Sequence, residues 1–293
     1  MKKLVRLSIV VFALFLMSMK GDMPAYMLFK ADGDNAKYKN LVKDAAAADV
    51  VLFGELHNNS ISHWMEYQLT SDIYTANDGN VVLGAEMFEA DNQLLLDEYL
   101  SGKIKERNFE AEAKLWKNYK TDYKPLVDFA KEKDLPFIGT NIPRRYASVV
   151  HGEGFEGLDG LDETAKSYIA PLPIKYDPEL PGYKGMLEMM GDMGGGHTND
   201  NLPKAQAIKD ATMAYFILEN LKPGQTFIHY NGSYHSDNHE GIVWYLKQAN
   251  PDLNIITVTS VEQDTISSLN EDFKNTADYI ICIPSSMTKT YSN

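Results

Sequence analysis

The chain has 293 residues, of which 44% are hydrophobic and 24% are charged, and its formal net charge at pH 7 is −13. This composition is typical of a globular protein with a sizeable core, and it excludes a low-complexity chain. The excess of acidic groups repels phosphate backbones, so we expect no nucleic-acid partner.

The first twenty residues have the pattern of a signal peptide. Four basic residues and no acidic residue accompany an uncharged, mostly apolar run from Leu7 to Met19. A membrane-spanning helix needs about 20 apolar residues, so this run favours a signal peptide over a span. We expect export to the periplasm or cell envelope, with residues 21–293 as one domain; the alternative is an uncleaved anchor. The single cysteine, Cys282, is far from this segment, so we expect no lipid attachment to an N-terminal cysteine.

Short apolar runs alternate with helical patterns through the rest of the chain. The runs with the length of strands are 50–53, 81–85, 135–139, 226–230, 255–258 and 279–283. The helical patterns are 60–76, 90–100, 108–133, 207–221 and 239–249, the third with a break expected before Pro125. This order predicts an α/β fold, with a central, mostly parallel sheet and helices on both of its faces.

Residues 152–203 differ from the rest of the chain because glycine and proline are frequent there. Such a composition is not expected to form regular sheet. We interpret the region as an insertion over the edge of the sheet and as a candidate lid for a site. The alternative is a long surface excursion without a role.

The first candidate site is Gly54-Glu55-Leu56-His57, which directly follows an apolar strand. The carboxyl ends of parallel strands are the usual place for a site, and Gly54 lets the chain turn sharply there. Side chains alternate along a strand, so Glu55 and His57 should point to the same side. His63 follows on the next helix. A single histidine after a strand is more often structural than functional.

A further acid, Glu86, stands at the end of the run 81–85. An acid in an apolar run must be paired, metal-bound or protonated. The alternative is that Glu86 begins the next helix and favours its dipole. Beyond the next strand, Asn141 and Arg144 are candidate ligand-binding residues. The guanidinium of Arg144 can bind a carboxylate, phosphate or propionate through two hydrogen bonds. Arg145 is equally suited to pair with surface acids.

A second Gly-x-x-His segment, Gly232 to His235, again runs off an apolar strand, which also carries His229. Two such strand ends in one sheet are not expected by chance. Together with His57 they would place several imidazoles at one edge, as a transition-metal site or a general-base site requires. Gln206 and Asp210, one helical turn apart, face either this site or solvent.

Taken together, these segments are similar to the ChaN-like haem-binding proteins, a branch of the superfamily that also contains erythromycin esterases and the Tiki proteases. The similarity covers most of residues 21–293. The segments that carry it are Gly54-Glu55-Leu56-His57 with His63, Glu86-Met87-Phe88, Trp116 with Tyr119 and Tyr123-Lys124-Pro125-Leu126, Asn141-Ile142-Pro143-Arg144, Ala205-Gln206-Ala207 with Asp210 to Ala214, and Gly232 to His235. The resemblance implies a sheet-centred fold with a polar cleft at the strand ends.

For the ChaN branch, the resemblance implies that haem is held through a tyrosine, with two subunits paired around it. No motif places this tyrosine, and the candidates we name are Tyr176 and Tyr183 in residues 152–203. Arg144 and the tyrosines and methionines of the chain suit the propionates and the apolar face of haem. The leading hypothesis is therefore a haem- or iron-binding protein of a bacterial uptake system, which forms a homodimer around haem. The chain departs from many ChaN-like proteins in lacking the cysteine for lipid attachment.

The rival hypothesis is a hydrolase, because the Tiki and erythromycin esterase branches resemble this chain at the same glutamate and histidine positions. In a metal-dependent enzyme of this kind, His57, Glu86 and His235 would hold a divalent ion and Glu55 would activate the attacking water. If the chain is an enzyme of either kind, the catalytic residues would be Glu55, His57 and His235. A third interpretation is a binding scaffold whose ancestral site is idle.

Overall fold

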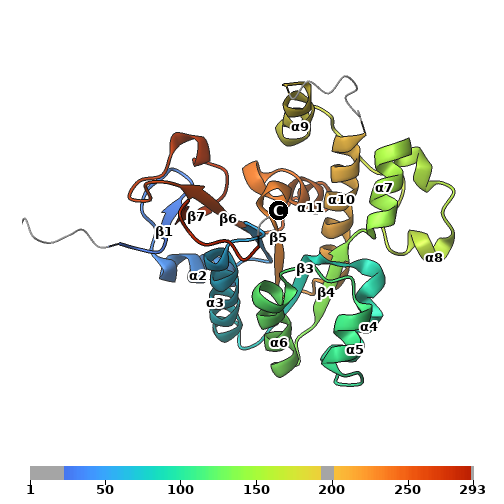
Figure 1. The fold of residues 1–293 in the computed structure, drawn as a ribbon, viewed down its shortest axis with the longest axis horizontal. Helices are drawn as coiled ribbons and strands as arrows, with labels where there is room; N and C mark the ends of the chain where they lie inside the picture. Colours follow the sequence, from blue (N-terminus) through green and yellow to red (C-terminus); the bar gives the residue numbers. More distant parts are fainter. Residues whose placement is uncertain (1–22, 193–200, 292–293) are drawn as a thin grey trace, which may run out of the picture.

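The computed structural model describes residues 23–192 and 201–291, in which seven strands form one sheet in the order β1-β7-β6-β2-β5-β3-β4 (Figure 1). The strands are β1 (Met27–Lys30), β2 (Val50–Glu55), β3 (Val81–Glu89), β4 (Phe137–Asn141), β5 (Thr226–Gly232), β6 (Ile255–Gln263) and β7 (Tyr279–Pro284). Neighbouring strands are parallel except β1, which pairs antiparallel with β7. The predicted mostly parallel sheet is confirmed, and β1 is an additional edge strand that we did not expect from its residues.

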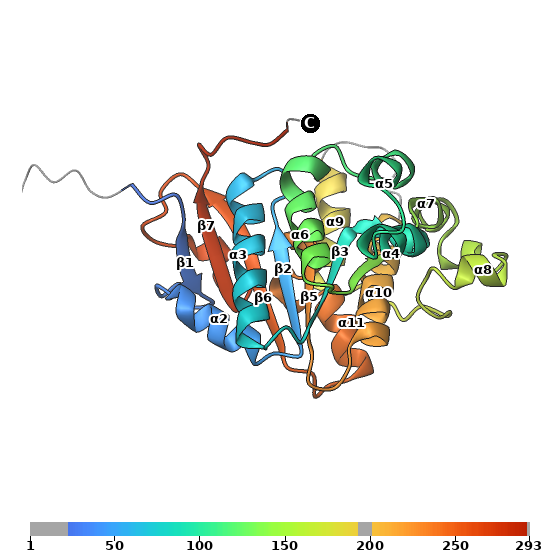
Figure 2. The same ribbon diagram turned by 90° about the horizontal axis from the view of Figure 1, so that it is seen from below.

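Helices cover both faces of this sheet (Figure 2). They are α2 (Tyr38–Ala46), α3 (Ser60–Ala76), α4 (Gln93–Leu100), α5 (Glu106–Glu112), α6 (Lys124–Glu132), α7 (Arg144–Glu153), α8 (Glu163–Lys166), α9 (Pro181–Asp192), α10 (Leu202–Asn220) and α11 (Ile242–Ala249). Val51 and Phe53 of β2 pack in one apolar cluster with α2, α3 and α6, whereas Val50 and Leu52 pack in another with α10 and α11. Successive strand residues point to opposite faces, so a sheet covered on both faces needs the unbroken apolar run of β2.

The sequence pattern predicted the bounds of one helix correctly and those of another only in part. α3 occupies residues 60–76 as predicted, and the Asn59 side chain caps it by accepting two backbone N–H groups of its first turn, at 3.0 and 3.2 Å. The helix predicted over 108–133, with a break before Pro125, is confirmed in part, because α5, a π-helical turn at Tyr119–Tyr123 and α6 occupy this stretch. Pro125 lies in the first turn of α6, where its missing N–H costs little, so the break expected before it is present.

Residues 152–203 contain no strand within the part that the structure describes. The region holds the end of α7 together with α8 and α9. Its side chains Leu158 and Ile169 pack in one apolar cluster with Ile208 of α10, which fixes this part of the insertion to the main body. Residues 193–200 lie outside the described residues, and the role of the region as a lid stays a prediction.

The predicted signal peptide at residues 1–20 also lies outside the described residues. Among the residues that the structure does describe, no helix has both the length and the apolar character that crossing a bilayer requires. Export therefore stays an expectation from the sequence.

The carboxyl ends of β2, β5 and β3 lie side by side, because β5 pairs in parallel with both other strands. Glu55 at the end of β2 is in register with Gly232 at the end of β5. Glu86 lies within β3 and is buried, so its alternative position at the start of a helix is wrong. The fold thus brings the acids and the two Gly-x-x-His segments to one edge of the sheet.

Candidate functional site

The two Gly-x-x-His segments pack against each other at the carboxyl ends of β2 and β5. A Cβ atom on Gly232 would lie 2.8 Å from the His57 ring, and one on Gly54 would lie 2.9 Å from Cα of Ser233. Contacts of a real Cβ atom are longer than this, so each glycine makes room for the other segment. The convergence expected from the sequence is present, because His57 and His235 line the same pocket.

His57 is the accessible imidazole of this site, with a side chain that is 41% exposed. Its Nδ1 lies 2.6 Å from Oε1 of Glu55, as expected for two side chains on the same side of a strand. Tyr123 donates a hydrogen bond to the same oxygen. Because Nδ1 donates to a carboxylate, Nε2 carries the lone pair of the neutral ring. Burial would lower the pKa of His57, but the hydrogen bond and the charge of Glu55 outweigh it and raise that pKa.

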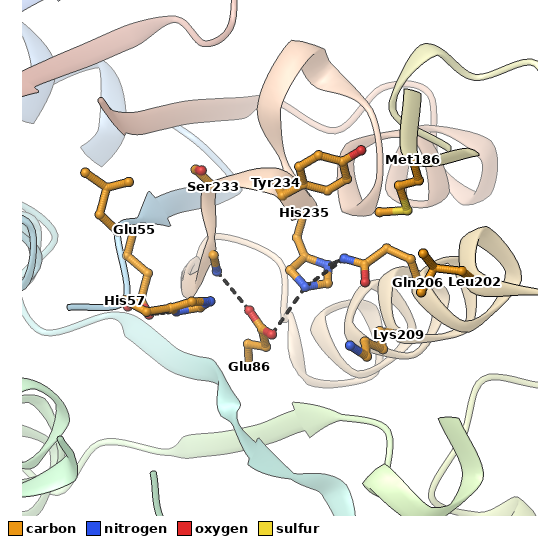
Figure 3. A pocket seen from close by; sticks show the side chains of 12 residues that line it. Glu55, His57, Glu86, Met186, Leu202, Gln206, Lys209, Ser233, Tyr234 and His235 are labelled. Atoms are coloured by element: carbon orange, nitrogen blue, oxygen red, sulfur yellow. Dashed lines mark hydrogen bonds and ion pairs between the residues drawn. The ribbon is translucent and has the colours of Figure 1, made fainter. Parts of the chain in front are cut away.

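His235 is buried between two carboxylates. Its Nδ1 lies 2.5 Å from Oδ1 of Asp210, and its Nε2 lies 3.2 Å from Oε1 of Glu86 (Figure 3). The side-chain amide nitrogen of Gln206 lies 3.0 Å from both ring nitrogens. Burial would lower the pKa of His235, but Glu86 and Asp210 outweigh it and raise that pKa to about 10. His235 is therefore an imidazolium at neutral pH.

Glu86 joins the two segments. One of its oxygens pairs with His235, and the other accepts a hydrogen bond from the N–H of Gly232 at 2.8 Å (Figure 3). Burial would raise the pKa of Glu86, but the charge and hydrogen bond of His235, the charge of His57 and the Gly232 N–H hold it well below its usual range. Of the states expected for an acid in an apolar run, the structure thus shows the paired one.

A pocket of about 500 Å³ at the strand ends is lined by Glu55, His57, Glu86, Gln206, Gly232, Ser233 and His235. The lining is completed by Leu56, Met186, Leu202, Tyr234 and Lys209 (Figure 3). Met186 lies on α9 and Leu202 begins α10, so residues 152–203 contribute part of the wall. Apolar walls with a few convergent polar groups are typical of small-molecule sites.

A second set of charged groups lies outside the pocket lining, on and beside α3. Nδ1 of His63 lies 2.9 Å from Oε2 of Glu66 and 3.6 Å from Oε2 of Glu55. Burial would lower the pKa of His63, but Glu66 and Glu55 outweigh it and raise that pKa to about 10. Burial and Glu55 raise the pKa of Glu66 well above its usual value. Burial would also raise the pKa of Glu55, yet His63 and His57 lower it.

A second pocket, of about 440 Å³, adjoins the first and shares Glu86 and Lys209 with it. Lys114 and Arg144 bring two more cations to its lining. Asn141 also lines it and donates a hydrogen bond to the backbone oxygen of Glu86 at 3.0 Å. The structure therefore places the predicted ligand-binding residues Asn141 and Arg144 beside the main pocket rather than in it.

Other predicted residues line neither pocket. His229 is buried inside the sheet, and burial lowers its pKa to about 4, so the ring is neutral. The buried hydroxyl of Tyr183 donates a hydrogen bond to Oδ2 of Asp210 at 2.7 Å. The Tyr176 ring packs against the Tyr183 ring, with 5.7 Å between their centroids. Tyr234, which we did not single out from the sequence, is the tyrosine that lines the 500 Å³ pocket.

Glu66 and Lys209 were not singled out from the sequence either, because a charged residue on a helix normally indicates a solvent-facing side. Glu66 is nevertheless fully buried. The signal that could have identified it is its position three residues after His63, which places both side chains on one helical face.

Two groups of residues could bind a metal ion, and they differ in how their ligand atoms are placed. In the predicted set of His57, Glu86 and His235, both ring nitrogens of His235 already face carboxylates. Among the described residues, a group whose ligand atoms all lie within 4.8 Å of one another is Glu55, His63 and Glu66. A metal ion at the predicted set stays a prediction.

The pocket offers one accessible base, His57, and one cation on its wall, Lys209. Neutral His57 can accept a proton or form a metal bond through Nε2, while Glu55 orients the ring. The His235 imidazolium is already paired with Glu86 and Asp210, so it offers no free charge to a ligand. Lys209 brings a positive charge to the wall. These features suit an anionic ligand, or a reaction in which negative charge develops.

Comparison with known proteins agrees with this architecture. A family model described as haem-binding uptake, Tiki superfamily, ChaN matches residues 41–246. Among the curated proteins, none matches the sequence significantly.

Two solved structures share the fold. One concerns cofacial haem binding to ChaN of Campylobacter jejuni; its TM-score is 0.66 at 17% sequence identity, and the match covers 87% of this chain and 96% of that chain. The other is a mutant of the erythromycin esterase EreC in its open conformation, with a TM-score of 0.52 at 10% identity, covering 92% of this chain and 99% of that chain. At these identities the likeness shows the fold alone.

Proposed function

Because the chain belongs to the haem-binding uptake family of the Tiki superfamily, the family of ChaN, we propose that it binds haem in the pocket at the carboxyl ends of β2, β3 and β5. The observation that carries this proposal is the 500 Å³ pocket itself, whose volume lies within the range of about 300 to 1,000 Å³ common for small-molecule sites. The adjoining pocket shares Glu86 and Lys209 with it, so a flat ligand has room to extend into both.

The lining residues fit the chemistry of haem. Met186, Leu202 and the ring of Tyr234 offer apolar surface to the porphyrin face. Lys209 between the two pockets and Arg144 in the second would bind the propionates, because both side chains are cations at neutral pH. When bound, haem would supply an iron centre with a free coordination position for a protein ligand.

For the iron ligand we propose Tyr234 in place of the residues named from the sequence. Its side chain lines the pocket and the residue is 48% exposed. Its hydroxyl donates a hydrogen bond to the backbone oxygen of Gly182 at 2.6 Å, a contact that the bond to iron would replace. The hydroxyl of Tyr183 is buried and bonded to Asp210, so it is less available.

Haem titration of the purified chain tests this proposal. We expect a saturable Soret band, and Tyr234→Phe should weaken haem affinity at least about tenfold, which corresponds to about 1.4 kcal/mol. Tyr176→Phe is the matched control, because it removes a phenol that lines neither pocket, and its affinity should equal that of the wild type. Equal affinities of the Tyr234→Phe and wild-type proteins would exclude Tyr234 as the ligand, and the absence of saturable binding would overturn the proposal as a whole.

We further propose that two copies of the chain pair around haem and that the protein acts after export, in haem or iron uptake. Cofacial haem binding to the Campylobacter jejuni protein supports the pairing, and the signal-peptide pattern of residues 1–20 supports export. Light scattering should report a monomer without haem and a dimer with haem. The same mass in both states would contradict the pairing.

A second candidate function is hydrolysis, favoured by the pairing of the half-exposed His57 with the buried Glu55. In this arrangement His57 would take the proton of an attacking water through Nε2. Glu55 would orient the ring, and Lys209 on the pocket wall would stabilise the developing negative charge. This differs from the role predicted for Glu55, because the structure buries that carboxylate behind His57 and Tyr123.

The variant His57→Ala separates the two functions. If the chain is a hydrolase, cleavage of an activated ester such as p-nitrophenyl acetate should fall by about 10² to 10⁴ in this variant, the contribution of a general base. Its haem affinity should stay within about twofold of the wild type if Tyr234 binds the iron. Cleavage that is unchanged in His57→Ala would exclude this hydrolase mechanism.

A further inference from the structure

A group of three donor residues lies beside the pocket, and two of them, His63 and Glu66, have no part in either function proposed above. It consists of Glu55 from the end of β2 with His63 and Glu66 from α3, and their ligand atoms all lie within 4.8 Å of one another. All three residues are buried, with exposures of 3%, 5% and 0%. Neither His63 nor Glu66 lines the pocket, so this group is distinct from the His57, Glu86 and His235 set.

The hydrogen bonds around His63 determine which of its nitrogens is free. Nε2 lies 3.1 Å from the backbone oxygen of His57 and 3.6 Å from Oδ2 of Asp122. A backbone oxygen only accepts, so Nε2 carries a proton. In the neutral ring the lone pair then lies on Nδ1, which faces Oε2 of both Glu55 and Glu66. A lone pair facing two carboxylates requires a positive charge between them.

A proton on Nδ1 of His63 leaves two carboxylate oxygens of this group without a partner. It can serve the hydrogen bond to Oε2 of Glu66, but Oε2 of Glu55 and Oε1 of Glu66 have no hydrogen-bond partner. The other oxygen of Glu55 is occupied by His57 and Tyr123, so Oε2 is the atom left for another ligand. Unpartnered carboxylate oxygens in a buried site are costly, and a cation bound by Oε2 of Glu55 and by the Glu66 carboxylate would offset the charge of both acids.

From these contacts we propose that Glu55, His63 and Glu66 form a binding site for one divalent transition-metal ion. Donor atoms at the usual metal distance of about 2.0 to 2.2 Å in a tetrahedral site lie about 3.4 Å apart. Nδ1 of His63 lies 2.9 and 3.6 Å from the two nearest carboxylate oxygens, so the ligands need to move little. An imidazole with two carboxylates suits Zn²⁺, Mn²⁺ or Fe²⁺ rather than Ca²⁺ or Mg²⁺, which prefer oxygen ligands alone.

The hydrogen bond from Nε2 of His63 to the backbone of His57 supports this assignment, because metal-binding histidines usually donate their other N–H to an acceptor that fixes the ring. The site also has a direct connection to the pocket. Glu55 would bind the ion through Oε2 and hold His57 through Oε1. The ion would therefore act as a buried support for His57, the accessible imidazole of the pocket.

Metal titration of the metal-stripped chain tests the proposal, with Zn²⁺ and Co²⁺ as probes and no haem present. We expect one equivalent to bind per chain, to raise the melting temperature, and to give Co²⁺ the visible absorption of a low-coordinate site. Glu66→Gln and His63→Gln should abolish that equivalent. His235→Gln is the matched control, because it removes a buried histidine from the other set and should leave this equivalent in place.

Two results would overturn the proposal. One is the absence of a bound equivalent in the wild type, which would show that protons alone occupy the group. The other is binding that survives in Glu66→Gln but disappears in His235→Gln, which would place the ion at the pocket set. If Glu66→Gln fails to fold, X-ray absorption of the Co²⁺-loaded wild type decides, because this site provides one imidazole ligand and the pocket set provides two. The outcome is independent of the haem titration.

Discussion

The two Gly-x-x-His segments have the same spacing and the same position at the end of a parallel strand, yet their histidines have different states. The His57 side chain is 41% exposed and pairs with one carboxylate, whereas that of His235 is 6% exposed and lies between two. The difference arises outside the motif, because Asp210 on α10 and Glu86 on β3 surround His235. A shared motif therefore determines where an imidazole lies, and its neighbours determine whether it is available for chemistry.

The largest expected effect comes from removing the histidine that is enclosed. His235→Ala leaves Glu86 and Asp210 as buried carboxylates without their cation, which should cost about 3 to 5 kcal/mol of unfolding free energy. His57→Ala removes a half-exposed ring, and Glu55 keeps its hydrogen bond from Tyr123, so the cost should be about 1 to 2 kcal/mol. Urea unfolding of both variants measures this comparison, and equal costs would contradict it.

The packing of one segment against the other predicts a smaller effect. In Gly232→Ala the new Cβ would lie 2.8 Å from the His57 ring, so the ring must move, and we expect a loss of about 1 to 3 kcal/mol. Gly152→Ala is the matched control, because a Cβ there meets nothing within 4 Å and the residue lies in α7. That variant should be neutral or more stable by about 0.5 to 1 kcal/mol. A Gly232→Ala protein as stable as Gly152→Ala would show that the two segments do not interlock.

The last expected effect is a pH dependence of stability, which His235 should show more strongly than His57. Its pKa is raised from 6.5 to about 10, so its contribution to stability is complete below pH 6.5 and is lost as the pH rises toward 10. The pKa of Glu86 is lowered from 4.5, so its contribution is complete above pH 4.5 and is lost in more acidic solution. The stability difference between the wild type and His235→Gln should therefore be greatest between about pH 4.5 and 6.5. Urea unfolding across a pH series checks this, and a difference that does not vary with pH would contradict the ion pairing.

The sequence was sufficient to predict the sheet and the meeting of the two segments, because both follow from local patterns. An unbroken apolar run indicates a strand covered on both faces, and the end of such a strand in a parallel sheet lies beside the ends of its neighbours. The pairing of Glu55 with His57 followed from strand alternation. These inferences needed no knowledge of which helix packs where.

The residues that surround each histidine were harder to predict, because long-range packing selects them. Glu66 lies on a helix with many polar residues, and only its packing against β2 shows that it is buried. Asp210 was expected to face either the site or solvent, and its contact with His235 depends on how α10 crosses the sheet. Tyr183 was named only because it lies in residues 152–203, and in the structure its hydroxyl donates a hydrogen bond to Asp210.

The most direct test of the account is whether haem binds at the strand-end pocket. A haem titration should compare the wild type with Leu202→Glu, which puts a charge into the apolar wall, and with Leu94→Glu, which changes a 71% exposed leucine that does not line the pocket. We predict that the wild type and Leu94→Glu bind haem with equal affinity and that Leu202→Glu binds at least about tenfold more weakly, a loss of about 1.4 kcal/mol. Equal affinity in all three proteins would place haem elsewhere and contradict the account.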